Sequence, residues 1–217
     1  MSSSSGEDRP TIVDVPENRY DDAIHHLKWN FFADEPLNNA VGLCARGESQ
    51  RELERHCLLT LKQGYSRMLV DKKGAIVGMA LNGIQKKGER EEAERRLDEL
   101  NDEKFKMIFR LLYKVNEKVD LFAKYDVDEL FECRILSVDA DHRGKGYANM
   151  LMEDSQQIAK NAGFKVCKAD ATGAFSQKVY EKYNFKVEAE IPYTELDESV
   201  RPAPPHQALK LMVKLLN

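Results

Sequence analysis

The chain has 217 residues, and its 33 lysines and arginines against 37 aspartates and glutamates give a formal net charge of −4. Sequence-independent binding to the phosphates of a nucleic acid needs a clear excess of positive charge. The net negative charge therefore excludes a protein that binds nucleic acid in this way. At 42% hydrophobic and 32% charged residues the chain is too apolar for wholesale disorder, and no apolar run approaches the roughly 20 residues that cross a bilayer. We therefore expect a globular protein with no nucleic-acid or membrane partner.

The serine-rich start and the scattered cysteines indicate a cytoplasmic protein. Residues 1–9 lack the cationic start and the hydrophobic segment of a secretion signal, and we expect a short disordered tail there. The four cysteines form no CxxC pair and stand near no histidine at zinc-finger spacing, so we expect reduced thiols and no metal site. No repeat and no long linker divides the rest, so residues 10–217 are expected to form one domain, acting as a monomer.

The first half of the chain alternates short strands with helices. Patterning predicts a strand at 11–15, helices at 20–32 and 48–61, and hairpin strands at 67–70 and 75–84 joined by a glycine turn. We expect the first helix to stop at Pro36, because a proline restricts the residue before it and lacks an N–H donor. The mixed charges of 86–106 favour a solvated helix face, and 105–122 a more buried helix.

The second half centres on a strand that ends in a glycine turn. Leu130–Val138 is the strongest strand signal in the sequence, and it leads directly into Asp139–Gly146 and a helix that Gly163 terminates. Further elements are predicted as strands at 164–169, 185–191 and 209–215, a helix at 176–183, and a stiff extended loop at 202–205. This alternation predicts an α/β fold.

The glycine turn carries the first chemical signal. Gly144 and Gly146 at the start of a helix allow the backbone to approach an anion, and Arg143 and Lys145 add positive charge. The turn is neither a Walker loop nor a Rossmann fingerprint, and an ordinary strand-to-helix connection is an alternative interpretation.

Together with the strand before it, this turn resembles the acetyl-CoA signature, (R/Q)xxGx(G/A), of the GCN5-related N-acetyltransferases (GNATs). Tyr180–Phe185 is similar to the later Y-x-x-x-G-F segment of that family, with Asn184 in place of the usual glycine, and asparagine tolerates the left-handed conformation. The resemblance implies a GNAT fold: a mixed, mostly antiparallel seven-stranded sheet flanked by helices. The sheet would be splayed between its fourth and fifth strands, at 130–138 and 164–169.

Phe31–Asn38 and the segment Pro202–His206 resemble the insect arylalkylamine N-acetyltransferases within that superfamily. The resemblance implies acetyl-CoA-dependent N-acetylation of a small primary amine of the dopamine, serotonin, tyramine or octopamine type, in a ternary complex. Alternatives are a polyamine or a protein N-terminus as acceptor, or a non-catalytic acyl-CoA-binding module.

The resemblance also implies which residues contact acetyl-CoA. A strand with an unpaired edge presents free amides and carbonyls, so the pantetheine arm can pair with one strand while the pyrophosphate lies on the glycine turn. The implied contacts are Ile135, Leu136 and Val138 on the strand, Arg143, Gly144, Lys145, Gly146, Tyr147 and Ala148 at the turn, and Thr172 and Ser176 beyond it.

Three residues are expected to carry the chemistry. Glu35 matches the glutamate that is assigned as general base in the insect family, although an acidic residue can also simply end a helix. Tyr180 is our preferred proton donor to the leaving thiolate, with Ser176 as a contributor or replacement. Aromatic residues at 29, 31 and 32 are candidates for an amine pocket or for ordinary core packing.

Overall fold

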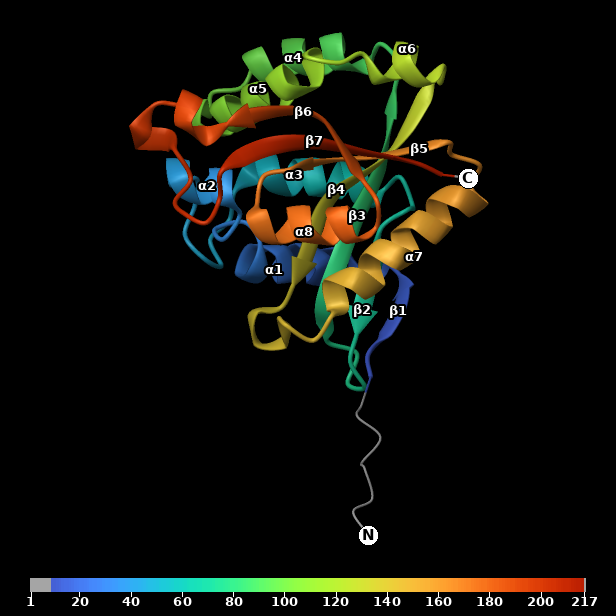
Figure 1. The fold of residues 1–217 in the computed structure, drawn as a ribbon. Helices are drawn as coiled ribbons and strands as arrows, with labels where there is room; N and C mark the ends of the chain where they lie inside the picture. The colour runs from blue at the N-terminus through green and yellow to red at the C-terminus, as the bar shows by residue number, and fades with distance from the viewer. Residues whose placement is uncertain (1–8, 217) are drawn as a thin grey trace.

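The computed structural model describes residues 9–216, so the predicted tail at 1–9 lies outside the described residues except for Arg9. Seven strands form one sheet in the order β1-β2-β3-β4-β5-β7-β6, and helices cover both of its faces (Figure 1). Every neighbouring pair is antiparallel except the parallel pair β4–β5. The predicted fold class is confirmed. Within residues 9–216, none of the helices combines the length and apolar character needed to cross a membrane.

The strands lie close to their predicted positions. They are β1 (Thr11–Asp14), β2 (Arg67–Val70), β3 (Ile76–Lys86), β4 (Glu129–Val138), β5 (Val166–Ala171), β6 (Lys186–Pro192) and β7 (Ala208–Leu215). The β2–β3 hairpin turns at Gly74, whose φ of +79° requires a residue that tolerates the left-handed region.

The helices divide between the two faces of the sheet. They are α1 (Tyr20–Asn30), α2 (Pro36–Val41), α3 (Arg51–Leu61), α4 (Glu89–Asp98), α5 (Glu103–Glu117), α6 (Leu121–Tyr125), α7 (Tyr147–Asn161) and α8 (Ala174–Lys182). Apolar residues of α1, α3 and α5 pack in one core layer with Met79 and Ile135 of the sheet. Helices α7 and α8 pack against Phe131, Cys133 and Cys167 in another layer. All four cysteines are free.

The sheet opens between β4 and β5. β4 pairs with β3 along its whole length, from Glu129 to Val138. Its pairing with β5 is restricted to Phe131 with Cys167 and Glu132 with Lys168, after which the two strands diverge. The splayed sheet expected from the sequence is therefore present.

Two helix boundaries differ from the prediction. α1 ends at Asn30, and Pro36 begins α2 instead of ending the earlier helix. A proline is well tolerated at the first helical position, where its missing N–H has no partner to lose. The helix predicted at 105–122 is two helices, because Asp120 caps a new N-terminus by accepting a hydrogen bond from the backbone N–H of Ala123.

Candidate active site

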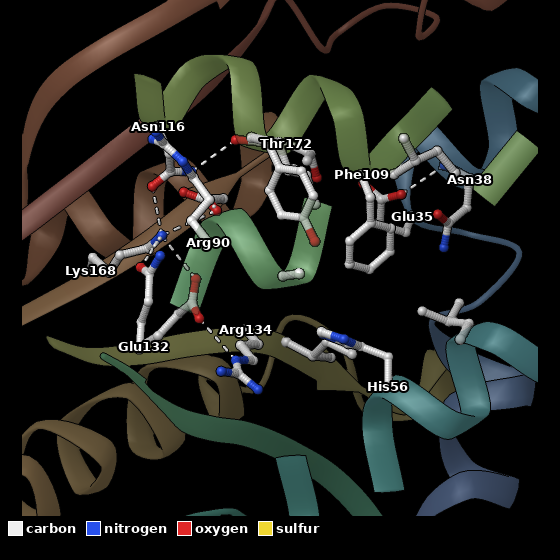
Figure 2. A pocket seen from close by; sticks show the side chains of 18 of the residues that line it. Glu35, Asn38, His56, Arg90, Phe109, Asn116, Glu132, Arg134, Lys168 and Thr172 are labelled. Carbon is white, nitrogen blue, oxygen red and sulfur yellow. Dashed lines mark hydrogen bonds and ion pairs between the residues drawn. The ribbon is translucent and has the colours of Figure 1, made fainter. Parts of the chain in front are cut away.

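A cavity of about 240 Å³ lies between the helical layer and the two diverging strands. Residues of α2, α3, α4 and α5 and of the loop before α2 line it, together with residues of β3, β4 and β5 and the residue that follows β5. Figure 2 shows Glu35 and Asn38 at one end of this cavity, and Glu132, Lys168 and Asn116 at the other.

Glu35 reaches the cavity because it is the N-cap of α2. Its Oε2 accepts a hydrogen bond from the backbone N–H of Asn38 at 2.7 Å, which satisfies a free donor of the helix. Only 9% of Glu35 is exposed, and its Oε1 has no hydrogen-bond partner within ordinary distance among the described residues. Burial raises the pKa of Glu35 above its usual value, although the nearby Thr172 hydroxyl and the amides of Asn38 and Leu37 act in the opposite direction. A raised pKa and an unpaired oxygen are properties of a general base.

Strand β5 supplies a polar stripe to the cavity. Alternation along β5 puts Lys168 and Asp170 on one face, and both line the cavity together with Thr172, which directly follows the strand. Thr172 lies at the Glu35 end, where its backbone carbonyl accepts a hydrogen bond from the Tyr193 hydroxyl at 2.7 Å.

A buried ion-pair network forms the opposite end of the cavity. Lys168 Nζ contacts Glu132 at 3.0 Å and donates a hydrogen bond to Asn116 at 2.7 Å, and Arg134 Nε donates to Glu132 at 2.9 Å. Burial would raise the pKa of Glu132, but Lys168 and Arg134 outweigh it and hold that pKa at about 2. Burial likewise raises the pKa of Asp170, with Lys168 opposing it. The charges of Glu132, Lys168 and Arg134 are therefore paired with one another, whereas Asp170 Oδ1, at the same end, is buried without a hydrogen-bond partner among the described residues.

The middle of the cavity is aromatic. The Phe109 ring meets His56 edge-on, with centroids 5.0 Å apart, and meets Tyr113 in the same manner at 6.3 Å. Of the three aromatic residues considered from the sequence, only Phe31 lines the cavity. The pocket interpretation is wrong for the other two, because Trp29 is 48% exposed and Phe32 is fully buried in the core. His56 and Tyr113 were missed, since each looks like one more residue of an amphipathic helix.

The predicted anion-binding turn has the expected backbone. Gly144 and Gly146 have φ values of +79° and +82°, and Gly146 is the N-cap of α7. A Cβ on either glycine would meet nothing within 4 Å, so the backbone is open to a ligand. The Arg143 side chain is engaged elsewhere: it donates hydrogen bonds to the backbone carbonyl of Val138 at 3.2 Å and to Asp34 at 3.1 Å. It thereby ties the turn to the residue next to Glu35.

The other implied coenzyme contacts follow the chain around the opening. Ile135, Leu136 and Val138 lie on the part of β4 that has no β5 partner. Lys145 is exposed at the turn, and Tyr147 and Ala148 begin α7.

The two candidate proton donors lie on α8, away from the lining of the cavity. Tyr180 is 3% exposed and packs against Phe185, with ring centroids 5.2 Å apart. Burial and the neighbouring Cys133 thiol raise the pKa of Tyr180 well above its usual value. The Ser176 hydroxyl donates a hydrogen bond to the Gly173 carbonyl at 2.9 Å. The cavity thus brings Glu35 and Thr172 together, while the roles of Tyr180 and Ser176 stay predictions.

Comparison with known proteins finds one family and a set of similar structures. The acetyltransferase (GNAT) domain family matches residues 111–187. The structure of arylalkylamine N-acetyltransferase 2 from Aedes aegypti has 47% sequence identity and a TM-score of 0.92, over 96% of this chain and 99% of that one.

Two more distant structures share the fold. A mosquito arylalkylamine N-acetyltransferase-like 5b has 20% identity and a TM-score of 0.85, over 95% of this chain and all of that one. A Drosophila melanogaster polyamine N-acetyltransferase, an enzyme that forms N-acetylagmatine, has 22% identity and a TM-score of 0.83 over the same shares.

Proposed function

Because the chain belongs to the GNAT acetyltransferases, and within them to the insect arylalkylamine N-acetyltransferases, we propose that it transfers the acetyl group of acetyl-CoA to the primary amine of an arylalkylamine. The observation that carries this proposal is the cavity itself. A buried carboxylate, Glu35, stands at one end of an aromatic chamber whose floor is the opening between β4 and β5.

The first step in this reaction is removal of a proton from the amine. An alkylamine has a pKa of about 10, so roughly one molecule in a thousand is neutral at pH 7. Glu35 takes this proton, directly or through a water, and its burial brings its pKa closer to the working pH. The neutral amine nitrogen then bonds to the acetyl carbon and releases a second proton, the carbon–sulfur bond breaks, and coenzyme A leaves as a thiolate that a donor must protonate.

We assign the donor to Tyr180, with Ser176 as the alternative. Tyr180 supports this role because its raised pKa keeps it protonated throughout the neutral range. Its neighbours Cys133 and Cys167 lie on β4 and β5, so the hydroxyl is close to the opening between the strands.

Acetyl-CoA is placed along the opening of the sheet. Ile135, Leu136 and Val138 offer unpaired backbone groups to the pantetheine arm, as an edge strand would offer them to another strand. The free amides at Gly144–Ala148 meet the pyrophosphate at the positive end of the α7 dipole. The four free cysteines support our placement of the enzyme in a reducing, cytoplasmic compartment.

The test is a thiol-release assay with acetyl-CoA and a panel of amines. We expect turnover with tyramine, dopamine and serotonin, and kcat/KM at least tenfold lower with agmatine or spermidine. The physical reason is that the Lys168 ammonium already lies between Glu132 and Asp170, so it repels the second cation of a polyamine from the far end of the cavity. Preferred turnover of a polyamine would replace this proposal with the polyamine alternative, and binding of acetyl-CoA without turnover of any amine would favour a sensor module.

A further inference from the structure

Helix α1 contacts both parts of the expected acetyl-CoA site. The Nε2 atom of His26 accepts a hydrogen bond at 3.1 Å from the hydroxyl of Ser137, which lies on the part of β4 that has no β5 partner. One helical turn later, Asn30 Oδ1 accepts a hydrogen bond at 3.0 Å from the backbone N–H of Ala140, where the segment towards the glycine turn begins. Arg143, directly before the glycines, donates to the backbone carbonyl of Asn30 at 3.2 Å. The same short stretch of α1 therefore contacts the strand expected for pantetheine and the segment expected for pyrophosphate.

The contact between His26 and Ser137 is buried and has a defined direction. His26 is 4% exposed and Ser137 is 3% exposed. Burial lowers the pKa of His26 to about 4, although the carbonyl of Ile76 acts in the opposite direction, so the imidazole is neutral at pH 7. That carbonyl lies 3.3 Å from Nδ1 and can only accept a hydrogen bond, which assigns the proton of the ring to Nδ1. Nε2 is then the acceptor, and the Ser137 hydroxyl is the donor.

The contact between Asn30 and Ala140 is of another kind, because it is exposed. Ala140 lies at the surface, where water can satisfy its N–H without Asn30. Asn30 is nevertheless held in place, since its Nδ2 donates to the backbone carbonyl of His26 at 3.0 Å. Burial does not require this contact, and what it does is fix the position of Ala140 relative to α1.

Coenzyme A is a ligand of two linked halves, a pantetheine arm and a nucleotide diphosphate. Once one half of such a ligand is bound, the other binds at a high effective concentration, provided that the two halves of the site are correctly spaced. A site whose halves move relative to each other loses this gain, because binding then has to restore the spacing. Each half of the ligand, offered separately, is insensitive to that spacing.

We propose that His26 and Asn30 are positioning residues, which hold the pantetheine strand and the pyrophosphate turn at the separation that one molecule of acetyl-CoA spans. They act through the backbone at Ser137 and Ala140 and not through contact with the coenzyme. This inference rests on the acetyl-CoA site of the proposed function, and it holds for any acceptor amine.

The experiment compares a ligand that spans the site with its two halves. Calorimetric titrations measure the Kd of coenzyme A, of pantetheine, and of adenosine 3′-phosphate 5′-diphosphate in wild type, Ser137→Ala and Asn30→Ala. We expect each variant to weaken coenzyme A about fivefold, the size of one net hydrogen bond, and to change the Kd of either half by less than about twofold. KM for acetyl-CoA should rise by the same factor with kcat nearly unchanged, because saturating coenzyme itself holds the two parts in place.

The matched control is Asn161→Ala. Asn161 is the last residue of α7, as Asn30 is of α1, and it is exposed and accepts a hydrogen bond from Gln157 on its own helix. It should leave all three affinities unchanged.

Equal weakening of coenzyme A and both halves, as a general loss of structure would cause, would overturn this proposal, and so would an unchanged affinity for coenzyme A. Asn30→Ala removes an exposed contact, so it decides the question even where Ser137→Ala does not fold. A wild type that shows the expected affinities but acetylates no amine would overturn the proposed function and leave this inference standing. A wild type that does not bind coenzyme A would overturn both.

Discussion

Replacing Lys168 with methionine should destabilise the protein strongly, because it removes one partner of a buried ion pair. The Lys168 side chain is 2% exposed, and its Nζ lies 3.0 Å from Glu132 and 3.4 Å from Asp170. Leaving a buried charge without its partner typically reduces the free energy of unfolding by about 3–5 kcal/mol. Glu132 keeps Arg134 at 2.9 Å and Asp170 keeps Asn116 at 3.0 Å, so we expect a loss near the lower end, about 3 kcal/mol.

This loss can be measured by thermal and urea unfolding. For a chain of this size about 1 kcal/mol corresponds to roughly 2–4 °C, so Tm should fall by about 6–12 °C. The pKa of Glu132 is lowered from 4.5 to about 2, so its contribution is present above pH 4.5 and is lost as the pH falls towards 2. The difference between Lys168→Met and wild type should shrink over that interval.

Lys186→Met is the matched control, because Lys186 is exposed on β6 and should change the free energy of unfolding by less than about 0.5 kcal/mol. A fall in Tm of under 2 °C for Lys168→Met, or a difference from wild type that does not depend on pH, would refute the reasoning. The double variant with Glu132→Gln should be less destabilised than the sum of the single variants, since the two side chains interact directly.

Three further predictions concern the reaction. Glu35→Gln should lower kcat/KM about 100-fold or more in steady-state assays. A loss of kcat/KM below threefold would exclude Glu35 as the base. The same substitution should raise Tm at pH 7 but not at acid pH, because a raised pKa means that the stability contributed by Glu35 is lost as the pH rises through that pKa. Gly146→Asp should weaken acetyl-CoA binding in calorimetric titrations far more than Gly146→Ala, which shares the strain at φ +82° without the charge, and equal affinities would remove the turn from the binding site. In single-turnover transfer, Tyr180→Phe should be slower than wild type by about tenfold and slower than Ser176→Ala, and the reverse order would assign the proton donor to Ser176.

Local signals explain which parts of the fold were predictable. The strand at Leu130–Val138, the glycine turn and the helix after it are adjacent in sequence. The alternation of the strand, the glycines of the turn and the periodicity of the helix can therefore all be read from one short segment. The same is true of the hairpin turn at Gly74. Pro36 was misplaced because proline is compatible with both the end and the start of a helix, and the choice depends on the cap that Glu35 provides.

The interior of the cavity depends on pairings between distant segments. The contact between Glu132 and Lys168 follows from the register of two parallel strands, which no local pattern fixes. His56 and Tyr113 come together around Phe109 only when α3 packs against α5. Charged, histidine and tyrosine side chains on helices are usually solvated or structural, so their sequence context carries no sign of a shared site.

The opening between β4 and β5 also has a consequence for self-association. Beyond Glu132 and Lys168, neither strand pairs with the other, and an unpaired strand edge is a template on which a second chain can add. A coenzyme arm lying along β4 would cover that edge on one side of the opening. The ligand therefore acts as a protective cover as well as a substrate, and colloidal stability, amide hydrogen exchange of β4 and storage lifetime should all depend on how fully the protein is loaded with coenzyme A.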